Sequence, residues 1–364
     1  MPSLLSRLLL AFGLLTLSLA CAQAASLEQM AGQMIVIGFQ GDDADDASVR
    51  ALRDEIADGH LGGVMYLKTN VKSLDAVGAM NAAFKAAAPD LPPFITLDQE
   101  GGSVERLTRA VGFMEVPSAA AVAAKSSVQK AQAIYSSMAQ DIAALGFTVN
   151  FGPVADMAVN PDNRVIARVG RAFGTDPQTV AAYDSAFIAA HHQAGLVTAL
   201  KHFPGHGSST ADSHAGFVDI TNTWNQAELD PYRTLIAQGY DDLIMVGHLY
   251  HANYSGSDQK LPASLSPQWI DGVLRSELGF KGVVISDDLE MGAIRKLFSL
   301  RETVTGAVRA GTDVLLFSNT AQYHEGLGAE ILAILMDEAQ KDPAFAARIE
   351  QSYNRIVALK GRLH

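Results

Sequence analysis

The chain has 364 residues, of which 48% are apolar, 7% aromatic and 18% charged. This composition excludes a disordered tail, a collagen-like repeat and a disulfide scaffold, and the length allows either two ordinary domains or one large α/β domain. The 39 acidic residues outnumber the 27 basic ones and give a net charge of −12, which argues against binding to nucleic acid and fits a small neutral or sugar-like ligand better.

Residues 1–24 have the pattern of a secretory signal. Arg7 precedes an apolar run over residues 8–20, and the small residues Ala22 and Ala24 then frame a cleavage site. The run is too short for a stable membrane span, so we expect export to the periplasm, or secretion, with removal of this segment. In the alternative interpretation Cys21, the only cysteine, is a lipid attachment site, although Ser18 matches that pattern poorly. Cleavage after Ala24 would leave a mature chain without cysteine.

Beyond this segment, short apolar strands alternate with helical patterns. Runs of strand length that are bounded by turn residues predict eight strands, over residues 33–40, 61–68, 93–100, 147–157, 197–206, 242–249, 282–289 and 312–319. Helical patterns include residues 128–145, 179–194, 228–238, 267–278, 302–310 and 343–363. Strands separated by helices imply parallel crossovers, and eight such units predict an α/β fold, a single (β/α)8 TIM-type barrel over residues 25–364. The last helical stretch is expected to pack outside the barrel.

Polar side chains gather where the predicted strands end. Asp98 follows the third strand, Lys201 and His202 end the fifth, and Asp287 follows the seventh. Because the C-terminal strand ends of such a barrel form one catalytic face, we expect these four side chains to converge on one pocket. An acidic residue after a strand can also cap a helix, and this interpretation is favoured for Asp288. Asp287 directly follows a buried apolar strand and is interpreted as functional.

A histidine-rich stretch allows two chemical interpretations. In one, His202, His206 and His214 hold a metal, but a proline and two glycines interrupt the helix that such a site usually needs, so neither metal nor cofactor is expected. In the other, Lys201 and His202 donate hydrogen bonds to a polyhydroxylated ligand. Asp212 lies two residues before His214, where its carboxylate can hold the ring and raise its proton affinity.

Four motifs together resemble one family. They are LDQEGG at 97–102, KHFPGHG at 201–207, DSH at 212–214 and ISDDLEM at 285–291. In this order they closely resemble the glycoside hydrolase family 3 β-N-acetylglucosaminidases of the NagZ type, over nearly the whole mature chain, and residues 150–156, 170–177 and 261–267 are similar as well. The resemblance implies a retaining exo-glycosidase that removes terminal β-linked N-acetylglucosamine from peptidoglycan fragments or chitooligosaccharides.

The resemblance also implies catalytic roles. Asp287 matches the family's nucleophile, and His214 matches the general acid/base, with Asp212 as its partner. Retaining hydrolysis needs a carboxylate that attacks the anomeric carbon and a second group that donates and then accepts a proton. An imidazole suits the second task because it titrates near neutral pH. The surrounding loop, residues 205–216, is rich in glycine and serine, so the histidine is expected to swing in when substrate binds.

The predicted sugar-binding residues carry charge. Asp98, Arg106, Arg171, Lys201 and His202 match family positions that bind the sugar hydroxyls and the acetamido group. Charged donors and an acceptor carboxylate suit this task because they replace the hydration of a polar ring.

Two departures from the family pattern and three alternative functions remain. Ser103 stands where the family usually has arginine, so the sequence does not determine which aglycone is released. Single-domain relatives are typically cytoplasmic, whereas the signal pattern predicts export.

A phosphorylase is one alternative function, because a neutral histidine allows phosphate to approach without like-charge repulsion. A β-glucosidase of the same family is another. A non-catalytic carbohydrate-binding barrel is the third, although it would be expected to lose Asp287 or the Asp212/His214 pair. We expect a monomer with an amino-sugar oligosaccharide substrate and no nucleic-acid partner.

Overall fold

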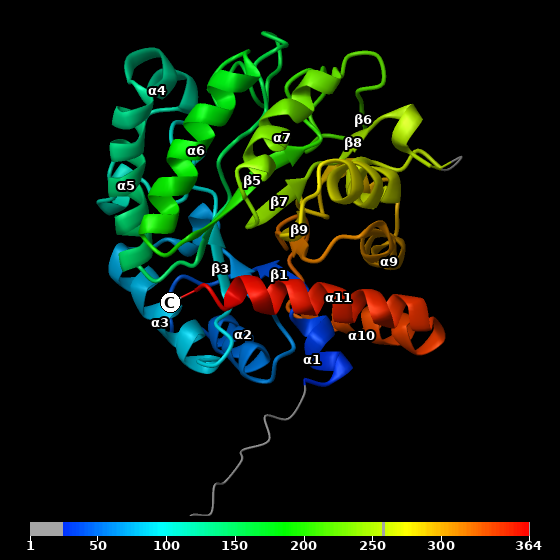
Figure 1. Cartoon of the computed structure of the whole chain (residues 1–364). Helices are drawn as coiled ribbons and strands as arrows, with labels where there is room; N and C mark the ends of the chain where they lie inside the picture. Colours follow the sequence, from blue (N-terminus) through cyan, green and yellow to red (C-terminus); the bar gives the residue numbers. More distant parts are fainter. Residues whose placement is uncertain (1–24, 257–258, 364) are drawn as a thin grey trace, which may run out of the picture.

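The computed structural model describes residues 25–256 and 259–363 (Figure 1). The expected signal segment, residues 1–24 with Cys21, lies outside the described residues. Among the helices that the structure describes, none combines the length and the apolar character that crossing a membrane requires.

Eight parallel strands form the centre of the molecule. Their order in the sheet, β10-β1-β2-β3-β4-β5-β7-β9, pairs the last strand with the first, and a parallel bridge between Ile285 and Val314 links the two ends. The sheet is therefore a nearly closed barrel, and the prediction of a (β/α)8 fold is confirmed. The strands are β1 (Ile35–Gly38), β2 (Gly63–Met65), β3 (Phe94–Leu97), β4 (Val149–Asn150), β5 (Val197–Phe203), β7 (Leu243–Val246), β9 (Val283–Ser286) and β10 (Leu315–Phe317).

Each predicted strand region contains one observed strand, but β4 is much shorter than expected. Only Val149–Asn150 forms a strand in the sheet, although the sequence predicts one strand over residues 147–157. Pro153 interrupts the ladder because it has no N–H to donate. The chain then continues beside β5, where the Ala155 N–H donates to the Lys201 carbonyl at 2.8 Å. This detour leads the chain toward the C-terminal end of β5.

Helices cover the outside of the barrel, and several begin at a serine or aspartate whose side chain accepts a backbone N–H, as at Ser73, Ser127 and Asp176. The predicted helix 267–278 is a π-helix, Gln268–Glu277. The α-helices are α1 (Leu27–Gly32), α2 (Ala47–Ala57), α3 (Leu74–Ala87), α4 (Ala119–Lys125), α5 (Val128–Ala144), α6 (Pro177–Gln193), α7 (Asp230–Ala237), α8 (Gly292–Arg295), α9 (Leu300–Ala310), α10 (Leu327–Lys341) and α11 (Pro343–Lys360). A small sheet that was not predicted pairs β6 (Val218–Asp219) with β8 (Leu249–Tyr250).

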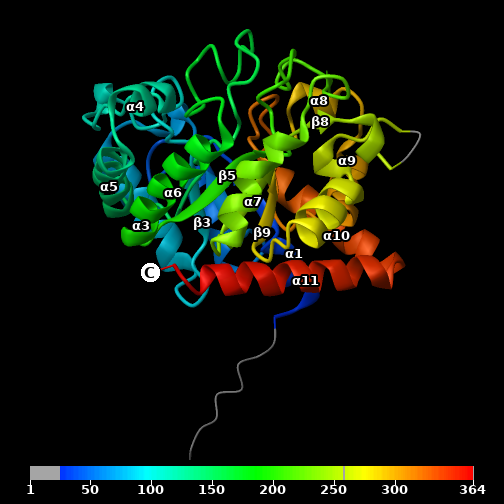
Figure 2. The ribbon, with the colours of Figure 1, turned by 45° about the horizontal axis from the view of Figure 1, so that its top comes forward.

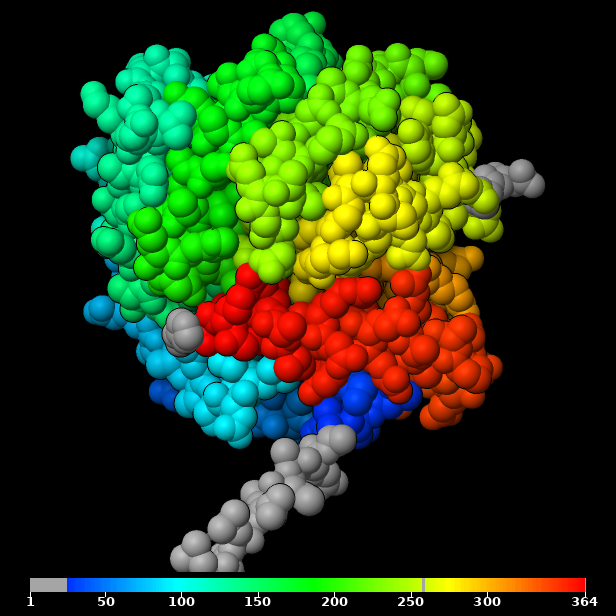
Figure 3. Space-filling model, in the orientation of Figure 1, coloured from blue at the N-terminus to red at the C-terminus, as the bar shows by residue number. Residues whose placement is uncertain are grey.

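Helix α11 closes one end of the barrel. It runs across the end opposite the loops that carry α8 and β8 (Figure 2) and lies on the surface of the molecule (Figure 3). Its buried Lys360 donates to Gln33 Oε1 at 2.7 Å and to the Gly62 carbonyl at 2.8 Å, just before β1 and β2 begin. The N-terminal ends of the strands are therefore covered, and the C-terminal ends remain as the accessible face.

Candidate active site

The C-terminal strand ends surround a cavity of about 380 Å³. Its lining includes apolar side chains such as Met65, Phe151, Met245 and Leu316, which suit the CH faces of a ring-shaped ligand. Ser103 lies on its wall. The predicted residues that line the cavity are Asp98, Arg106, Arg171, Lys201, His202, His214 and Asp287, so the predicted convergence of the strand-end side chains is observed.

Two carboxylates and three cations form a continuous network, and all of its members except Glu100 line the cavity. Asp98 contacts Arg106 Nη2 at 2.6 Å and Lys201 Nζ at 2.7 Å. Lys201 Nζ also lies 2.6 Å from Glu100 Oε1, and Glu100 receives a two-point contact from Arg171, at 2.8 and 2.7 Å. The cations exceed the carboxylates by one charge, which leaves donor capacity for a ligand.

The network holds its carboxylates in the ionised state. Burial alone would raise the pKa of Glu100, but Arg171 and Lys201 outweigh it and lower the pKa to about 2. The pKa of Asp98 is lowered in the same way, since Lys201 and Arg106 outweigh its burial. The side chains are thus fixed in place before any substrate arrives.

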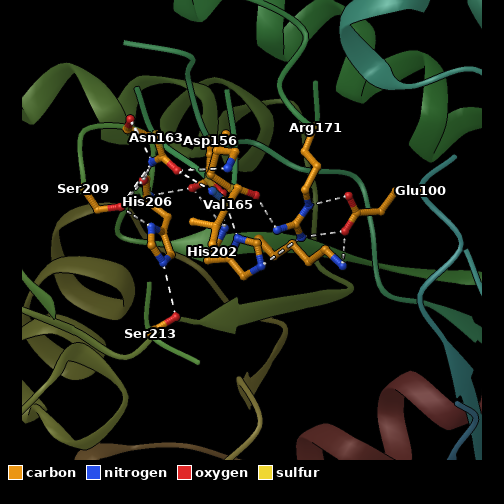
Figure 4. Close-up of polar contacts among 12 residues, drawn as sticks. Glu100, Asp156, Asn163, Val165, Arg171, His202, His206, Ser209 and Ser213 are labelled. Atoms are coloured by element: carbon orange, nitrogen blue, oxygen red, sulfur yellow. Dashed lines mark hydrogen bonds and ion pairs between the residues drawn. The ribbon is translucent and has the colours of Figure 1, made fainter. Parts of the chain in front are cut away.

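His202 is oriented from behind by Asp156 (Figure 4). His202 Nδ1 lies 2.7 Å from Asp156 Oδ2, and the same carboxylate accepts the backbone N–H of His206 at 2.6 Å. Arg171 Nη2 lies 3.4 Å from His202 Nε2. Because a guanidinium only donates, Nε2 is the acceptor and Nδ1 carries the proton that Asp156 accepts. The pKa of Asp156 is lowered, since His202 and His206 outweigh its burial.

The geometry of the histidines does not favour the metal interpretation. His206 Nδ1 pairs with Ser209 Oγ at 2.6 Å and Nε2 with Ser213 Oγ at 3.3 Å, so hydroxyl groups occupy both ring nitrogens (Figure 4). Burial lowers the pKa of His206 to about 4, which keeps the ring neutral. Within residues 25–256 and 259–363, no group of three or more His, Cys, Asp or Glu side chains is arranged to hold a metal ion.

Asp287 sits at the end of β9 with its carboxylate facing the cavity. Its backbone N–H donates to the Val246 carbonyl at 3.0 Å, and its Oδ1 accepts the Asp288 N–H at 2.8 Å. Burial alone would raise the pKa of Asp287, but the nearby His202 and His248 outweigh it and hold the pKa below its usual value. The carboxylate is therefore charged and available at neutral pH.

Asp288 does not cap a helix, so that prediction is wrong. Helix α8 begins only at Gly292, after an intervening turn. Asp288 Oδ1 instead accepts the N–H groups of Glu290 at 3.1 Å and Ser318 at 2.9 Å, which ties the loop after β9 to the end of β10. His248 Nε2 lies 2.8 Å from the Asp288 carbonyl oxygen and supports the same turn.

His214 and Asp212 form a local pair at the rim of the cavity. His214 Nδ1 lies 2.8 Å from Asp212 Oδ1, and the same oxygen accepts the His214 backbone N–H at 2.9 Å. The His214 side chain is 69% exposed, in contrast to the buried network below it. With Nδ1 held by the carboxylate, Nε2 is the nitrogen left to exchange a proton with a bound molecule.

Three residues that shape the site were not among the predicted ones. Glu100 lies within the LDQEGG motif and Asp156 within the similar stretch 150–156, so both were visible in the sequence without an assigned task. His248 follows β7 and had no motif to mark it. Each acts on a residue that does line the cavity, which is why only the three-dimensional contacts reveal it.

Comparisons with known proteins agree on one family. The model of the glycosyl hydrolase family 3 N-terminal domain matches residues 26–359. The chain is 34% identical over 305 residues to a β-hexosaminidase of Stenotrophomonas maltophilia, covering 81% of this chain and 86% of that one. It is 33% identical over 357 residues to the β-hexosaminidase LpqI of Mycobacterium tuberculosis, covering 94% and 86%.

Solved structures are similar as well. A glycoside hydrolase family 3 β-N-acetylglucosaminidase from a Paenibacillus species has a TM-score of 0.84 at 32% identity, and the match covers 93% of this chain but 63% of that one. A β-N-acetylhexosaminidase from Beutenbergia cavernae has a TM-score of 0.83 at 30% identity, with 93% and 99% covered.

Proposed function

Because the chain belongs to glycoside hydrolase family 3, we propose that it is a retaining exo-β-N-acetylglucosaminidase that removes terminal, non-reducing β-linked N-acetylglucosamine. The names of its relatives support the amino-sugar specificity. One observation carries the proposal for the chemistry: a charged carboxylate, Asp287, and an imidazole held by a carboxylate, His214, line the same cavity.

In the proposed first step, Asp287 attacks the anomeric carbon while His214 Nε2–H donates its proton to the glycosidic oxygen. The bond from carbon to the leaving oxygen breaks, a glycosyl ester forms on Asp287, and the aglycone departs as a neutral alcohol. Asp212 stabilises the imidazolium that donates the proton. In the second step His214 removes a proton from water, which attacks the same carbon and releases Asp287.

The buried network is proposed to bind the sugar. Asp98 accepts hydrogen bonds from sugar hydroxyls, and Arg106, Arg171 and Lys201 donate to hydroxyl or acetamido oxygens. His202, whose Nδ1–H is bound to Asp156, offers Nε2 as an acceptor in place of the donor role expected from the sequence. Because their mutual contacts are already made, the donors need little reorganisation when substrate enters. Glu100 and Asp156 are then positioning residues that act through Arg171, Lys201 and His202.

The test compares 4-nitrophenyl 2-acetamido-2-deoxy-β-glucoside with the plain 4-nitrophenyl β-glucoside. We expect clear preference for the acetamido substrate, and preference for the glucoside would refute the assignment. In phosphate buffer the product should be the free sugar. Formation of the sugar 1-phosphate would instead identify a phosphorylase.

The aglycone is proposed to come from peptidoglycan fragments or chitooligosaccharides, with contacts near Ser103 on the cavity wall. Comparing a muramic acid disaccharide with diacetylchitobiose as substrates decides between them.

Export is part of the same proposal. It rests on the pattern of residues 1–24 and would place the enzyme in the periplasm or outside the cell. Mass spectrometry of the mature N-terminus checks it: an N-terminus at Ala25 supports soluble export, and a lipid-modified Cys21 supports anchoring. We propose a monomer, which light scattering in solution can test.

A further inference from the structure

Helix α8 holds the tip of the loop that carries His214. The loop tip, residues 213–215, presents three successive carbonyl groups to the α8 segment, residues 292–296, which consists of α8 and Lys296 directly after it. In chain order these carbonyls accept the N–H of Ala293 at 3.1 Å, the N–H of Gly292 at 3.2 Å and the ammonium group of Lys296 at 2.8 Å. The acid/base loop is thus bonded to the same chain segment that follows Asp287.

The rest of this loop is anchored elsewhere. Its base is fixed by Asn163 Nδ2, which donates to the His206 carbonyl at 2.7 Å, and by Asn160 Nδ2, which donates to the Ser209 carbonyl at 2.9 Å. In the described part of the chain, the tip's other bonds are local ones to Asp212 and one long contact from its serine hydroxyl to His206, at 3.3 Å. The tip therefore depends on α8 for much of its placement.

Gly292 permits this close approach. A Cβ atom at this position would meet the His214 carbonyl oxygen at 2.7 Å and the Ala215 carbonyl oxygen at 3.0 Å. Its backbone conformation is one that other residues also adopt, so the loop tip, and not the local backbone, requires glycine here.

We propose that the α8 segment is a latch that positions His214 for proton transfer, with Lys296 as a positioning residue. The inference rests on the proposed role of His214. Since α8 follows directly from the turn after Asp287, the latch ties the acid/base to the element that presents the nucleophile. Proton transfer depends steeply on the position of the imidazole, whereas attack by Asp287 does not need the loop tip.

The test uses Lys296→Met, with Lys296→Arg as the conservative variant and Arg295→Met as the matched control. Arg295 is the exposed residue that precedes Lys296 and ends α8, and its side chain makes no hydrogen bond to the loop among the described residues. With diacetylchitobiose, whose leaving group needs protonation, we expect Lys296→Met to lower kcat/KM by about threefold to tenfold, the equivalent of a hydrogen bond worth about 0.7–1.4 kcal/mol.

With the nitrophenyl glycoside, whose leaving group needs little protonation, we expect a change below about twofold. Lys296→Arg should restore most of the loss, and Arg295→Met should show none. Gly292→Ala should act in the same direction as Lys296→Met and more strongly. In a His214→Ala background, Lys296→Met should cause no further loss. Equal losses on both substrates, or no loss on either, would overturn the latch.

Hydrogen exchange supplies a readout that does not depend on activity. We expect the amides of residues 213–217 to exchange faster in Lys296→Met and at the parental rate in Arg295→Met. Unchanged exchange in Lys296→Met would overturn the latch. If the parent protein hydrolyses no β-N-acetylglucosaminide, the proposed function fails, while the exchange measurement still decides whether α8 holds the loop.

Discussion

Replacing Glu100 with Gln should destabilise the protein without changing the shape of the side chain. Glu100 makes a two-point contact with Arg171 and a third contact with Lys201, and its side chain is only 7% exposed. The amide removes the negative charge and keeps one acceptor, while the other oxygen becomes an NH2 donor that faces at least the Arg171 guanidinium. The positive charges of Arg171 and Lys201 would then be buried with one negative charge fewer to balance them.

The magnitude follows from the pKa of Glu100. This pKa falls from its ordinary value of 4.5 to about 2 in the folded protein, because Arg171 and Lys201 outweigh the effect of burial. At 1.36 kcal/mol for each pH unit, the difference corresponds to a stabilisation on the order of 3 kcal/mol at pH 7. For a chain of this size, such a loss lowers the melting temperature by about 5 °C.

The difference between the pKa values of Glu100 in the folded and unfolded states also determines how stability changes with pH. A carboxyl with a depressed pKa stabilises the folded state fully above about pH 4.5, and its contribution is lost as the pH falls toward 2. The difference in unfolding free energy between the parent and Glu100→Gln should therefore fall to less than half of its pH 7 value at pH 3.

Thermal and urea unfolding at pH 7 and pH 3 measure this gap. Glu115→Gln is the matched control, because its contact with Arg109 is exposed and 3.6 Å long, and it should cost below about 0.5 kcal/mol. A loss below about 1 kcal/mol at pH 7, or a gap that does not change with pH, would refute the account of the network.

The remaining predictions concern catalysis. Asp287→Asn should lower kcat by at least about 10⁴-fold with 4-nitrophenyl 2-acetamido-2-deoxy-β-glucoside, since the amide cannot form the glycosyl ester, and activity within tenfold of the parent would contradict this role. His214→Ala should lose far more activity with diacetylchitobiose than with the nitrophenyl glycoside, and equal losses would argue against an acid role. Asp156→Asn should raise KM about tenfold by freeing the ring of His202, as measured by steady-state kinetics, and an unchanged KM would contradict its positioning role. EDTA should leave activity unchanged, and inactivation would revive the metal interpretation.

Strand ends were the part of the site that the sequence located best. Asp98, Lys201 and Asp287 each adjoin a buried apolar run, and a parallel barrel places the ends of all such runs on one face. The pair of Asp212 and His214 could be predicted for another reason. The two residues are only two positions apart, so Asp212 Oδ1 reaches both the backbone N–H and the ring Nδ1 of His214 within one turn of chain.

Contacts between distant segments could not be predicted in this way. Glu100 and Arg171 are 71 residues apart, and Asp156 and His202 are 46 residues apart. Periodicity reports which face of an element is buried, but not which polar side chain of another loop will meet it. The length of β4 was misjudged for a related reason, since Pro153 ends the ladder although the apolar pattern continues.

The site combines a buried ionic network with an exposed turn, and we expect these two parts to affect substrate recognition differently. The network around Asp98, Glu100 and Lys201 is buried and bonded to itself, so a change in one member disturbs several charges at once. His214 instead sits on an exposed turn that is held at its tip by α8. Such a turn tolerates substitution with smaller energetic cost. Variation outside the network, as at Ser103 on the cavity wall, is therefore expected to change the leaving group that the enzyme accepts, while the buried network is proposed to determine which sugar binds.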